Sequence, residues 1–177
     1  MIVSVPSGKL ASGGVFGHLL RNLAESFVDN MLREPVLPMR GCVVYCDLAF
    51  GIAEHSGVYV GGRTIVHLDG YGIIEAVSPE RFLDRLDGFN SAISIYISCA
   101  GDFASGDERT ARRAESMVGS RRDYNVLTDN CHRFVYGCLS GDFDNTCSSM
   151  ETLKLATARR LGTNTWRVWE KSDCEFV

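Results

Sequence analysis

The chain has 177 residues, a length at which one domain can bury a single core without disulfides or metals. Hydrophobic residues make up 45% and charged residues 23%, as in average soluble globular proteins, which excludes a disordered or collagen-like chain. The formal net charge is −4 and the basic residues are scattered, so no electrostatic surface for nucleic acid is indicated and we expect no nucleic-acid partner.

Seven cysteines lie at positions 42, 46, 99, 131, 138, 147 and 174, and none belongs to a Cys-x-x-Cys pair. Neither a zinc site nor a thioredoxin-type redox pair is indicated, and we expect no metal and no cofactor. Residues 1–14 lack the pattern of a signal peptide, and no apolar run reaches the roughly eighteen residues of a membrane-spanning helix. We therefore expect a protein of a reducing, cytoplasmic compartment without a transmembrane segment. Its cysteines should be mostly buried thiols outside disulfides, in particular Cys42, Cys46, Cys99 and Cys138.

The first predicted element is an amphipathic helix between Val15 and Leu32, where apolar residues recur at spacings of three and four until Pro35. Its polar face is not basic, so docking on the core is favoured over lying on a membrane. Only a transient membrane contact stays open as the alternative.

Later segments alternate between strand and helix patterns. A buried strand is expected over 41–47, and two strands are expected over 54–68, around a turn at Gly61-Gly62. The elements that follow are a helix over 79–86 begun by Ser78-Pro79, a strand over 92–98, a helix begun by the capping box Ser105 and Glu108 that ends at 117 or 118 before Gly119, and a helix that begins near Asn130. We find no internal repeat or linker. The predicted fold is α+β, with a small antiparallel sheet packed against helices.

Two of the four histidines, His55 and His67, lie twelve residues apart on the predicted pair of strands. Because strand side chains alternate between faces, the loop decides whether the two rings meet. A two-residue glycine loop would leave them on opposite faces. A three-residue loop would pair Tyr59 with Arg63 and His55 with His67, and we expect this register, in which one ring orients the other. For either histidine alone, a half-buried structural residue would be the preferred interpretation.

Cys131 falls in the first turn of the last predicted helix, after the candidate cap residues Asp129 and Asn130. Backbone N–H groups in such a turn stabilise negative charge, which favours a thiolate nucleophile. The same groups could hold the oxyanion of a tetrahedral intermediate. From spacing alone, another small buried cysteine is the stronger interpretation by a narrow margin.

Two segments around these residues carry a known pattern. Glu54-His55-Ser56-Gly57-Val58-Tyr59-Val60-Gly61 followed by Ile65-Val66-His67-Leu68 resembles the histidine box "HWxxYVG…VVHL", and the segment from Tyr124 to Val135 resembles the cysteine box "YxLLTxNCEHFV". Both boxes are those of the lecithin retinol acyltransferase-like family, in the circularly permuted branch of the NlpC-type, papain-like cysteine peptidase superfamily. The resemblance implies one catalytic domain over 1–177, with a helical extension over 1–37, a core over 38–141 and a C-terminal extension over 142–177.

The resemblance also implies a role for individual residues: Cys131 as nucleophile, His55 as general base and acid, and His67 as the orienting third residue. The sequence departs from the family pattern at two places. Ser56 stands where the family has an aromatic residue, and His132-Arg133 stands where it has Glu-His. Candidate substrate-pocket residues are Tyr59, Tyr124 and His132.

The function implied is a thiol acyltransferase or hydrolase that works through a Cys131 thioester on lipid acyl esters, as a phospholipase A or acyltransferase does. One alternative is an amidase or cysteine protease acting on peptide-like bonds. The other is a catalytically inactive binding module, against which the complete set of Cys131, His55 and His67 argues. The expected partner is an acyl-bearing lipid or a peptide-like substrate.

Overall fold

The computed structural model describes residues 34–48, 53–84, 94–123, 125 and 130–170. By its internal contacts the chain divides into Met1–Arg33 and Glu34–Val177, and every described residue belongs to the second unit. The helix expected between Val15 and Leu32 lies outside the described residues. The assignment of the whole chain to one catalytic domain stays a prediction.

The strands of the second unit form one antiparallel sheet, whose members are rich in Val, Ile and Tyr as the sequence predicted. Its order is β4-β3-β2-β1-β5-β6, and β7 pairs with β5. The seven strands among the described residues are β1 (Val43–Leu48), β2 (Ala53–Gly61), β3 (Thr64–Leu68), β4 (Ile74–Val77), β5 (Ile95–Ala100), β6 (Phe103–Ala104) and β7 (Thr165–Val168).

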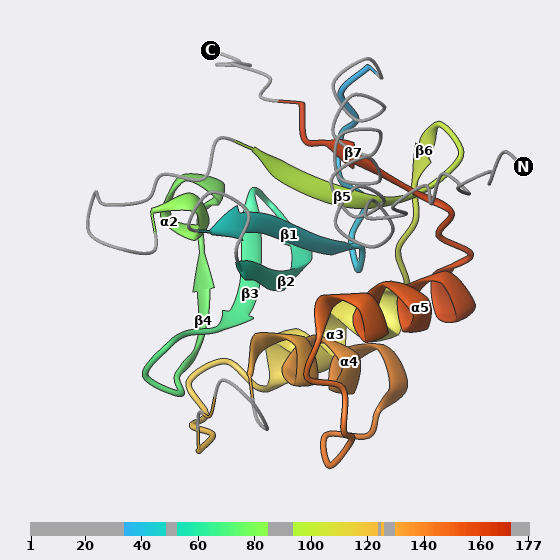
Figure 1. The fold of residues 1–177 in the computed structure, drawn as a ribbon. Helices are drawn as coiled ribbons and strands as arrows, with labels where there is room; N and C mark the ends of the chain where they lie inside the picture. The colour runs from blue at the N-terminus through green and yellow to red at the C-terminus, as the bar shows by residue number, and fades with distance from the viewer. Residues whose placement is uncertain (1–33, 49–52, 85–93, 124, 126–129, 171–177) are drawn as a thin grey trace, which may run out of the picture. The chain divides into compact units, whose positions relative to one another are not determined.

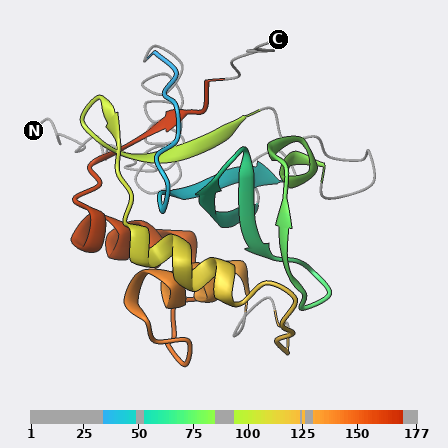
Figure 2. The same cartoon turned by 180° about the vertical axis from the view of Figure 1, so that it is seen from behind.

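Helices cover both faces of this sheet, as Figures 1 and 2 show. The bounds of those described are α2 (Pro79–Leu83), α3 (Glu108–Ser116), α4 (Cys131–Ser140) and α5 (Met150–Leu161). Helices α3, α4 and α5 lie together on one side, and α2 lies on the other. The expected α+β fold, an antiparallel sheet packed against helices, is confirmed. In the part of the chain that the structure describes, no helix has the length and apolar character needed to cross a membrane.

Alternation along the strands divides the buried residues into two cores. Val58 and Val66 belong to the core under α3, α4 and α5, where they meet Phe134. Ile65, one residue before Val66, belongs to the opposite core with Phe82 of α2. Complete burial of a side chain such as Phe82 or Phe134 contributes about 1.5–3 kcal/mol. Both faces of β2 and β3 are therefore dry, and a polar side chain on either face needs a partner.

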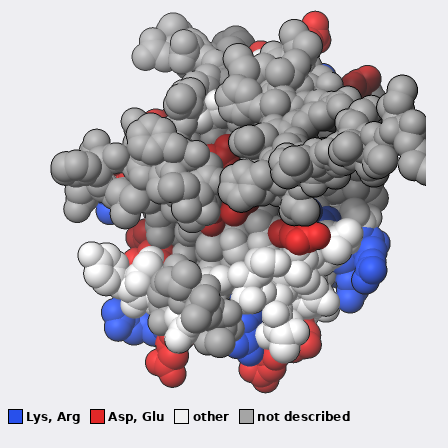
Figure 3. Space-filling model, viewed as in Figure 1, with Lys and Arg blue, Asp and Glu red and all other residues white. Residues whose placement is uncertain are grey.

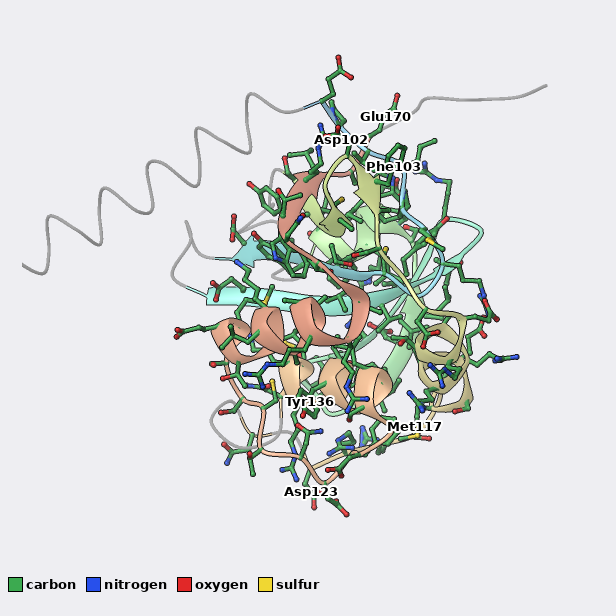
Figure 4. All side chains as sticks on the ribbon, turned by 90° about the vertical axis from the view of Figure 1, so that its right-hand side faces the viewer. Asp102, Phe103, Met117, Asp123, Tyr136 and Glu170 are labelled. Carbon is green, nitrogen blue, oxygen red and sulfur yellow. The ribbon has the colours of Figure 1, made fainter. Side chains whose placement is uncertain are left out.

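The surface of the described unit carries both polar and apolar side chains. Figure 4 shows Asp102, in the turn between β5 and β6, and Phe103, the first residue of β6, near Glu170 and far from Tyr136 of α4 and from Asp123. On the described part of the face drawn in Figure 3, basic and acidic side chains are interspersed. This mixture agrees with the scattered charge of the sequence.

The register of β2 and β3 differs from the expected one. Gly57, not His55, lies opposite His67, and Tyr59 pairs with Ile65 rather than with Arg63. The cause is an irregularity between Tyr59 and Gly61, because a bulge inserts an unpaired residue into one strand. The shift is by two residues, so the side chains of His55 and His67 keep the common face that we expected.

Four expected element boundaries are also corrected. Ser105 does not form a capping box with Glu108: the N-cap residue of α3 is Asp107, and the buried Ser105 hydroxyl lies 2.7 Å from Thr163 Oγ1 instead. Helix α3 ends at Ser116, α2 at Leu83 rather than at 86, and β5 runs to Ala100. Strands β4, β6 and β7 and helix α5 are additional to the expected elements.

Gly57 lacks a side chain at a place where the structure has no room for one. A Cβ added there would lie 2.7 Å from Ile65 Cγ2 and 3.1 Å from Phe82 Cε2. We expect Gly57→Ala to lower the free energy of unfolding by about 1–3 kcal/mol, the usual cost of overpacking. Urea unfolding measures it, with Gly70→Ala as the control because nothing lies within 4 Å of the Cβ position there. Equal stability of the two variants would contradict the packing described.

Candidate active site

Asn130 fixes the start of α4 and thereby the place of Cys131. Its Oδ1 accepts from the backbone N–H groups of His132 and Arg133 at 3.0 and 3.2 Å, and its carbonyl oxygen accepts from Phe134 N at 3.2 Å. Its Nδ2 donates to Ser148 O at 2.8 Å. Asn130 is therefore the N-cap residue, and Cys131, only 4% exposed, is the first residue of the helix. The other candidate cap, Asp129, lies outside the described residues.

The hydrogen bonds to Asn130 also affect the expectation that backbone N–H groups at the start of α4 hold the oxyanion of an intermediate. The amides of His132, Arg133 and Phe134 all donate to Asn130. A substrate oxyanion would compete with Asn130 for these donors. The N-cap residue thus organises the first turn of α4 around itself, and the positive end of the helix dipole still lies beside Cys131.

His55 and His67 form a buried pair on the face of the sheet covered by α2. His55 Nε2 lies 3.1 Å from His67 Nδ1, the rings meet edge-on with centroids 5.0 Å apart, and the residues are 5% and 0% exposed. They lie diagonally across β2 and β3, a separation that long side chains span. The ring of Phe82 packs on both, at centroid distances of 4.9 and 5.6 Å. Phe82 thus holds the two imidazoles in an apolar setting.

Glu75 of β4 lies opposite His67 in the sheet, and its Oε1 is 3.2 Å from His67 Nε2. An ionised carboxylate only accepts hydrogen bonds, so this contact assigns the proton to Nε2 of His67. In the neutral form of His67, Nδ1 is then the acceptor, and His55 donates to it from Nε2. A neutral imidazole has one protonated nitrogen, which leaves Nδ1 as the basic nitrogen of His55.

Cys131 meets strand β2 on its other face, through two neighbours. Its Sγ lies 3.9 Å from Nδ1 of His132, and that nitrogen lies 2.9 Å from Oγ of Ser56. Ser56 directly follows His55 in β2, and the two side chains point to opposite faces because the strand alternates. The structure therefore brings His55 and His67 into contact with each other and brings Cys131 to the strand that carries His55.

The other described thiols differ from Cys131 in their setting. Cys42, Cys99 and Cys138 are buried free thiols and Cys46 is also buried, as expected. Burial raises the pKa of the thiols of Cys42, Cys99 and Cys138, and it raises the pKa of Cys147 to about 11. These groups stay protonated near neutral pH and are poor nucleophiles. Of the described cysteines, only Cys131 begins a helix.

A cavity of about 340 Å³ opens beside α2, on the face of the sheet that also carries His55 and His67. The described residues that line it are Arg63, Pro79, Glu80, Leu83, Ser94, Ile95, Val168 and Trp169. Tyr59, a candidate pocket residue, packs edge-on against Trp169 with centroids 5.1 Å apart. Tyr124 lies outside the described residues, and no predicted triad residue lines the cavity. Among the described positions, no group of three His, Cys, Asp or Glu side chains is arranged to hold a metal ion.

The sequence analysis did not single out Glu75 or Phe82 as site residues, although both touch the histidine pair. A signal for Glu75 exists: residues 73–77 are an apolar segment with a single acid, directly after the Gly70-Tyr71-Gly72 turn that follows His67. Extending the pair of strands by this third strand would have placed an acid near His67. Phe82 has no comparable signal, because a one-turn helix does not specify which face it buries.

Asn130 gives a direct test of this geometry. We expect Asn130→Ala to lower the free energy of unfolding by about 1–2 kcal/mol, because the backbone N–H groups of His132 and Arg133 lose their side-chain acceptor. That corresponds to a drop of roughly 2–8 °C in Tm for a chain of this size, measured by differential scanning calorimetry. Asn130→Ser, which keeps an oxygen at the cap, should lose clearly less, and equal losses would argue against the cap.

A family model, lecithin retinol acyltransferase, matches residues 38–144, which begin where the expected core begins and include both boxes. A search of the curated proteins gave no match. Members of the matched family are typically acyltransferases, which indicates a function of the acyltransferase or hydrolase type. On the extent of this match, the chain belongs to the lecithin retinol acyltransferase family.

Proposed function

We propose that the protein is a cysteine-dependent acyltransferase or hydrolase that forms a thioester on Cys131 and acts on lipid acyl esters. The observation that carries the proposal is the hydrogen-bonded series His55–His67–Glu75, which assigns a basic nitrogen to His55, on the strand that Cys131 reaches through Ser56 and His132. A thiol at a helix N-terminus and an oriented imidazole are the two parts that cysteine acyl-transfer enzymes need, and here they are associated with successive residues of β2, from opposite faces of the strand.

The first half-reaction forms the thioester. His55 Nδ1 takes the proton of the Cys131 thiol, and the sulfur attacks the carbonyl carbon of the acyl ester. The C–S bond forms while the carbonyl oxygen becomes an oxyanion. When that oxyanion collapses, the bond between carbon and the leaving alkoxide breaks, and His55 returns its proton to the alkoxide.

The second half-reaction releases the acyl group. Water or an amine gives a proton to His55 and attacks the thioester carbonyl, and the C–S bond breaks to regenerate the Cys131 thiol. His67 donates to Glu75 throughout, so its Nδ1 remains available to accept from His55 when that ring becomes positively charged. The third residue therefore orients and stabilises His55 rather than taking its proton.

The substrate class rests on the family. The cavity beside α2 has an apolar wall of Pro79, Leu83 and Ile95, but Arg63 and Glu80 also line it, and it lies on the face of the sheet opposite to α4 and Cys131. We therefore do not assign the acyl chain of the substrate to this cavity. We also propose a reducing compartment as the working environment, which the free thiols of Cys42, Cys99 and Cys138 support.

Substitution in the proposed triad tests the reaction. With p-nitrophenyl butyrate as the probe, Cys131→Ala should abolish the acyl-enzyme seen by intact-protein mass spectrometry, because the attacking atom is gone. His55→Ala should lower the turnover rate by about 10²–10⁴, the usual worth of a positioned base. His67→Asn should cost less, and the double variant of His55 and Cys131 should be no slower than Cys131→Ala.

The outcomes separate the candidate functions. Full turnover by Cys131→Ala on a substrate that the wild type processes would overturn the proposal. A wild type that turns over short peptide amides but neither phospholipid nor acyl thioester would identify the amidase or protease instead. Failure of the wild type to form an acyl-enzyme with any of these probes would identify the inactive binding module.

Glu75 should act on turnover through the tautomer of His67. We expect Glu75→Gln to lower turnover about three- to tenfold, the equivalent of one net hydrogen bond of about 1 kcal/mol, because an amide can donate as well as accept at Nε2 and no longer selects the protonated form. The matched control is Glu108→Gln, which removes an acid whose exposed partner is Arg40. Turnover of Glu75→Gln equal to that control would contradict the assignment of the protons.

A further inference from the structure

Ser56 and His132 connect the centre of the sheet to the N-terminus of α4 by a contact that the proposed triad does not use. Oγ of Ser56 and Nδ1 of His132 are 2.9 Å apart, and the residues are 0% and 7% exposed. The same Nδ1 lies 3.9 Å from Sγ of Cys131. One buried nitrogen therefore contacts both the strand and the proposed attacking sulfur.

The ring of His132 is neutral in this setting. Burial, and secondarily the positive charge of Lys154 on α5, lower the pKa of His132 to about 4. The other charged groups around Lys154 are Asp47 of β1 and Glu54 of β2. The Nδ1 of a neutral imidazole can share one hydrogen bond with the Ser56 hydroxyl while the Cys131 sulfur lies against the same atom, and the ring does not act as a second base near neutral pH.

The contact with His132 restricts the side-chain rotamer of Cys131. A cysteine Sγ can occupy staggered positions about its χ1 bond, and only one of them suits attack on a given carbonyl. Ser56 fixes the plane of the His132 ring, and the ring in turn lies against Sγ. We propose that Ser56 and His132 are a positioning pair that holds the Cys131 sulfur in its attacking orientation; the inference rests on the proposed role of Cys131 as nucleophile.

The two positions are among those at which the sequence departs from the family boxes, with Ser56 in place of an aromatic residue and His132 in place of Glu. The structure places these two departures in direct contact. Ser56 is fully buried, so a large aromatic ring at this position would need the space that the imidazole occupies. The small hydroxyl and the imidazole thus fit as a pair, and neither replacement is explained as well alone.

Thiol reactivity tests the pair without knowledge of the substrate. The probe is iodoacetamide, and its rate of reaction is followed across a pH series for the peptide that carries Cys131. Ser56→Ala and His132→Leu should each slow alkylation of Cys131 about three- to tenfold, as expected for one lost hydrogen bond. His132→Asn, whose amide places a polar atom near the Nδ1 position, should recover the rate to within about twofold of the wild type.

Two further measurements distinguish positioning from simple loss of stability. Ser98→Ala is the matched control, because Ser98 is also a fully buried serine of this sheet, with its hydroxyl bonded to Val43 N and Ser105 O at 3.0 and 2.9 Å. It should lower Tm and leave the alkylation rate of Cys131 unchanged. Adding Ser56→Ala to His132→Leu should slow the reaction no further, because the hydroxyl acts through the ring.

The outcomes are separable from those of the proposed function. If His132→Asn is as slow as His132→Leu, or Ser98→Ala as slow as Ser56→Ala, the pair has a structural role only and the inference is wrong. If the wild-type Cys131 reacts quickly and neither Ser56→Ala nor His132→Leu changes its rate, the inference alone fails. If the wild-type Cys131 reacts no faster than buried Cys42 and Cys138, the proposed nucleophile fails, and this inference fails with it.

Discussion

Strand β2 presents successive side chains to opposite faces of the sheet, and both halves of the candidate site depend on this alternation. His55 points toward α2, where it meets His67 and Phe82, and Ser56 points toward α4, where it meets His132. A strand one residue out of register would exchange the two sides and destroy both contacts. The sheet, rather than any loop, therefore brings the two polar clusters to adjacent residues. This explains why both faces of β2 must be covered by helices.

The sheet buries the imidazole rings of three histidines and the hydroxyl of Ser56. Each of these groups needs a hydrogen-bond partner, since a buried polar group without one costs about 1–3 kcal/mol. The series from His55 through His67 ends at Glu75, whose side chain is 38% exposed, so the only formal charge in the series lies where water still reaches it. The buried rings themselves can stay neutral. Placing the charge at the rim avoids the penalty of an ionised pair in the interior and still fixes the protons of the buried rings.

The common face of His55 and His67 was predicted from strand alternation together with an assumed three-residue loop, and it holds in the structure because the observed register differs from the expected one by two residues, which preserves the face. Strand alternation could not predict the register, because the irregularity between Tyr59 and Gly61 depends on how the turn packs and not on the strand pattern. Asn130 was a correct candidate for the cap because cap chemistry is local, whereas Ser105 matched a capping box but binds Thr163, 58 residues away. Helix α5 and strand β7 lacked a clear pattern, since most of their burial comes from distant contacts.

His132 lies beside Cys131, with Nδ1 3.9 Å from Sγ, whereas His55 precedes Ser56 in β2 and points to the opposite face, and the environments of the two histidines argue for different roles. The pKa of His132, lowered from 6.5 to about 4, means that protonating this ring costs about 2–4 kcal/mol more than in water. A thiolate–imidazolium pair with His132 would carry that cost in every turnover. His55 instead donates to His67, which can stabilise the positive ring when the thiol gives up its proton. The cost of placing a proton on His132 thus argues against this ring as the base and leaves it the task of orienting the sulfur.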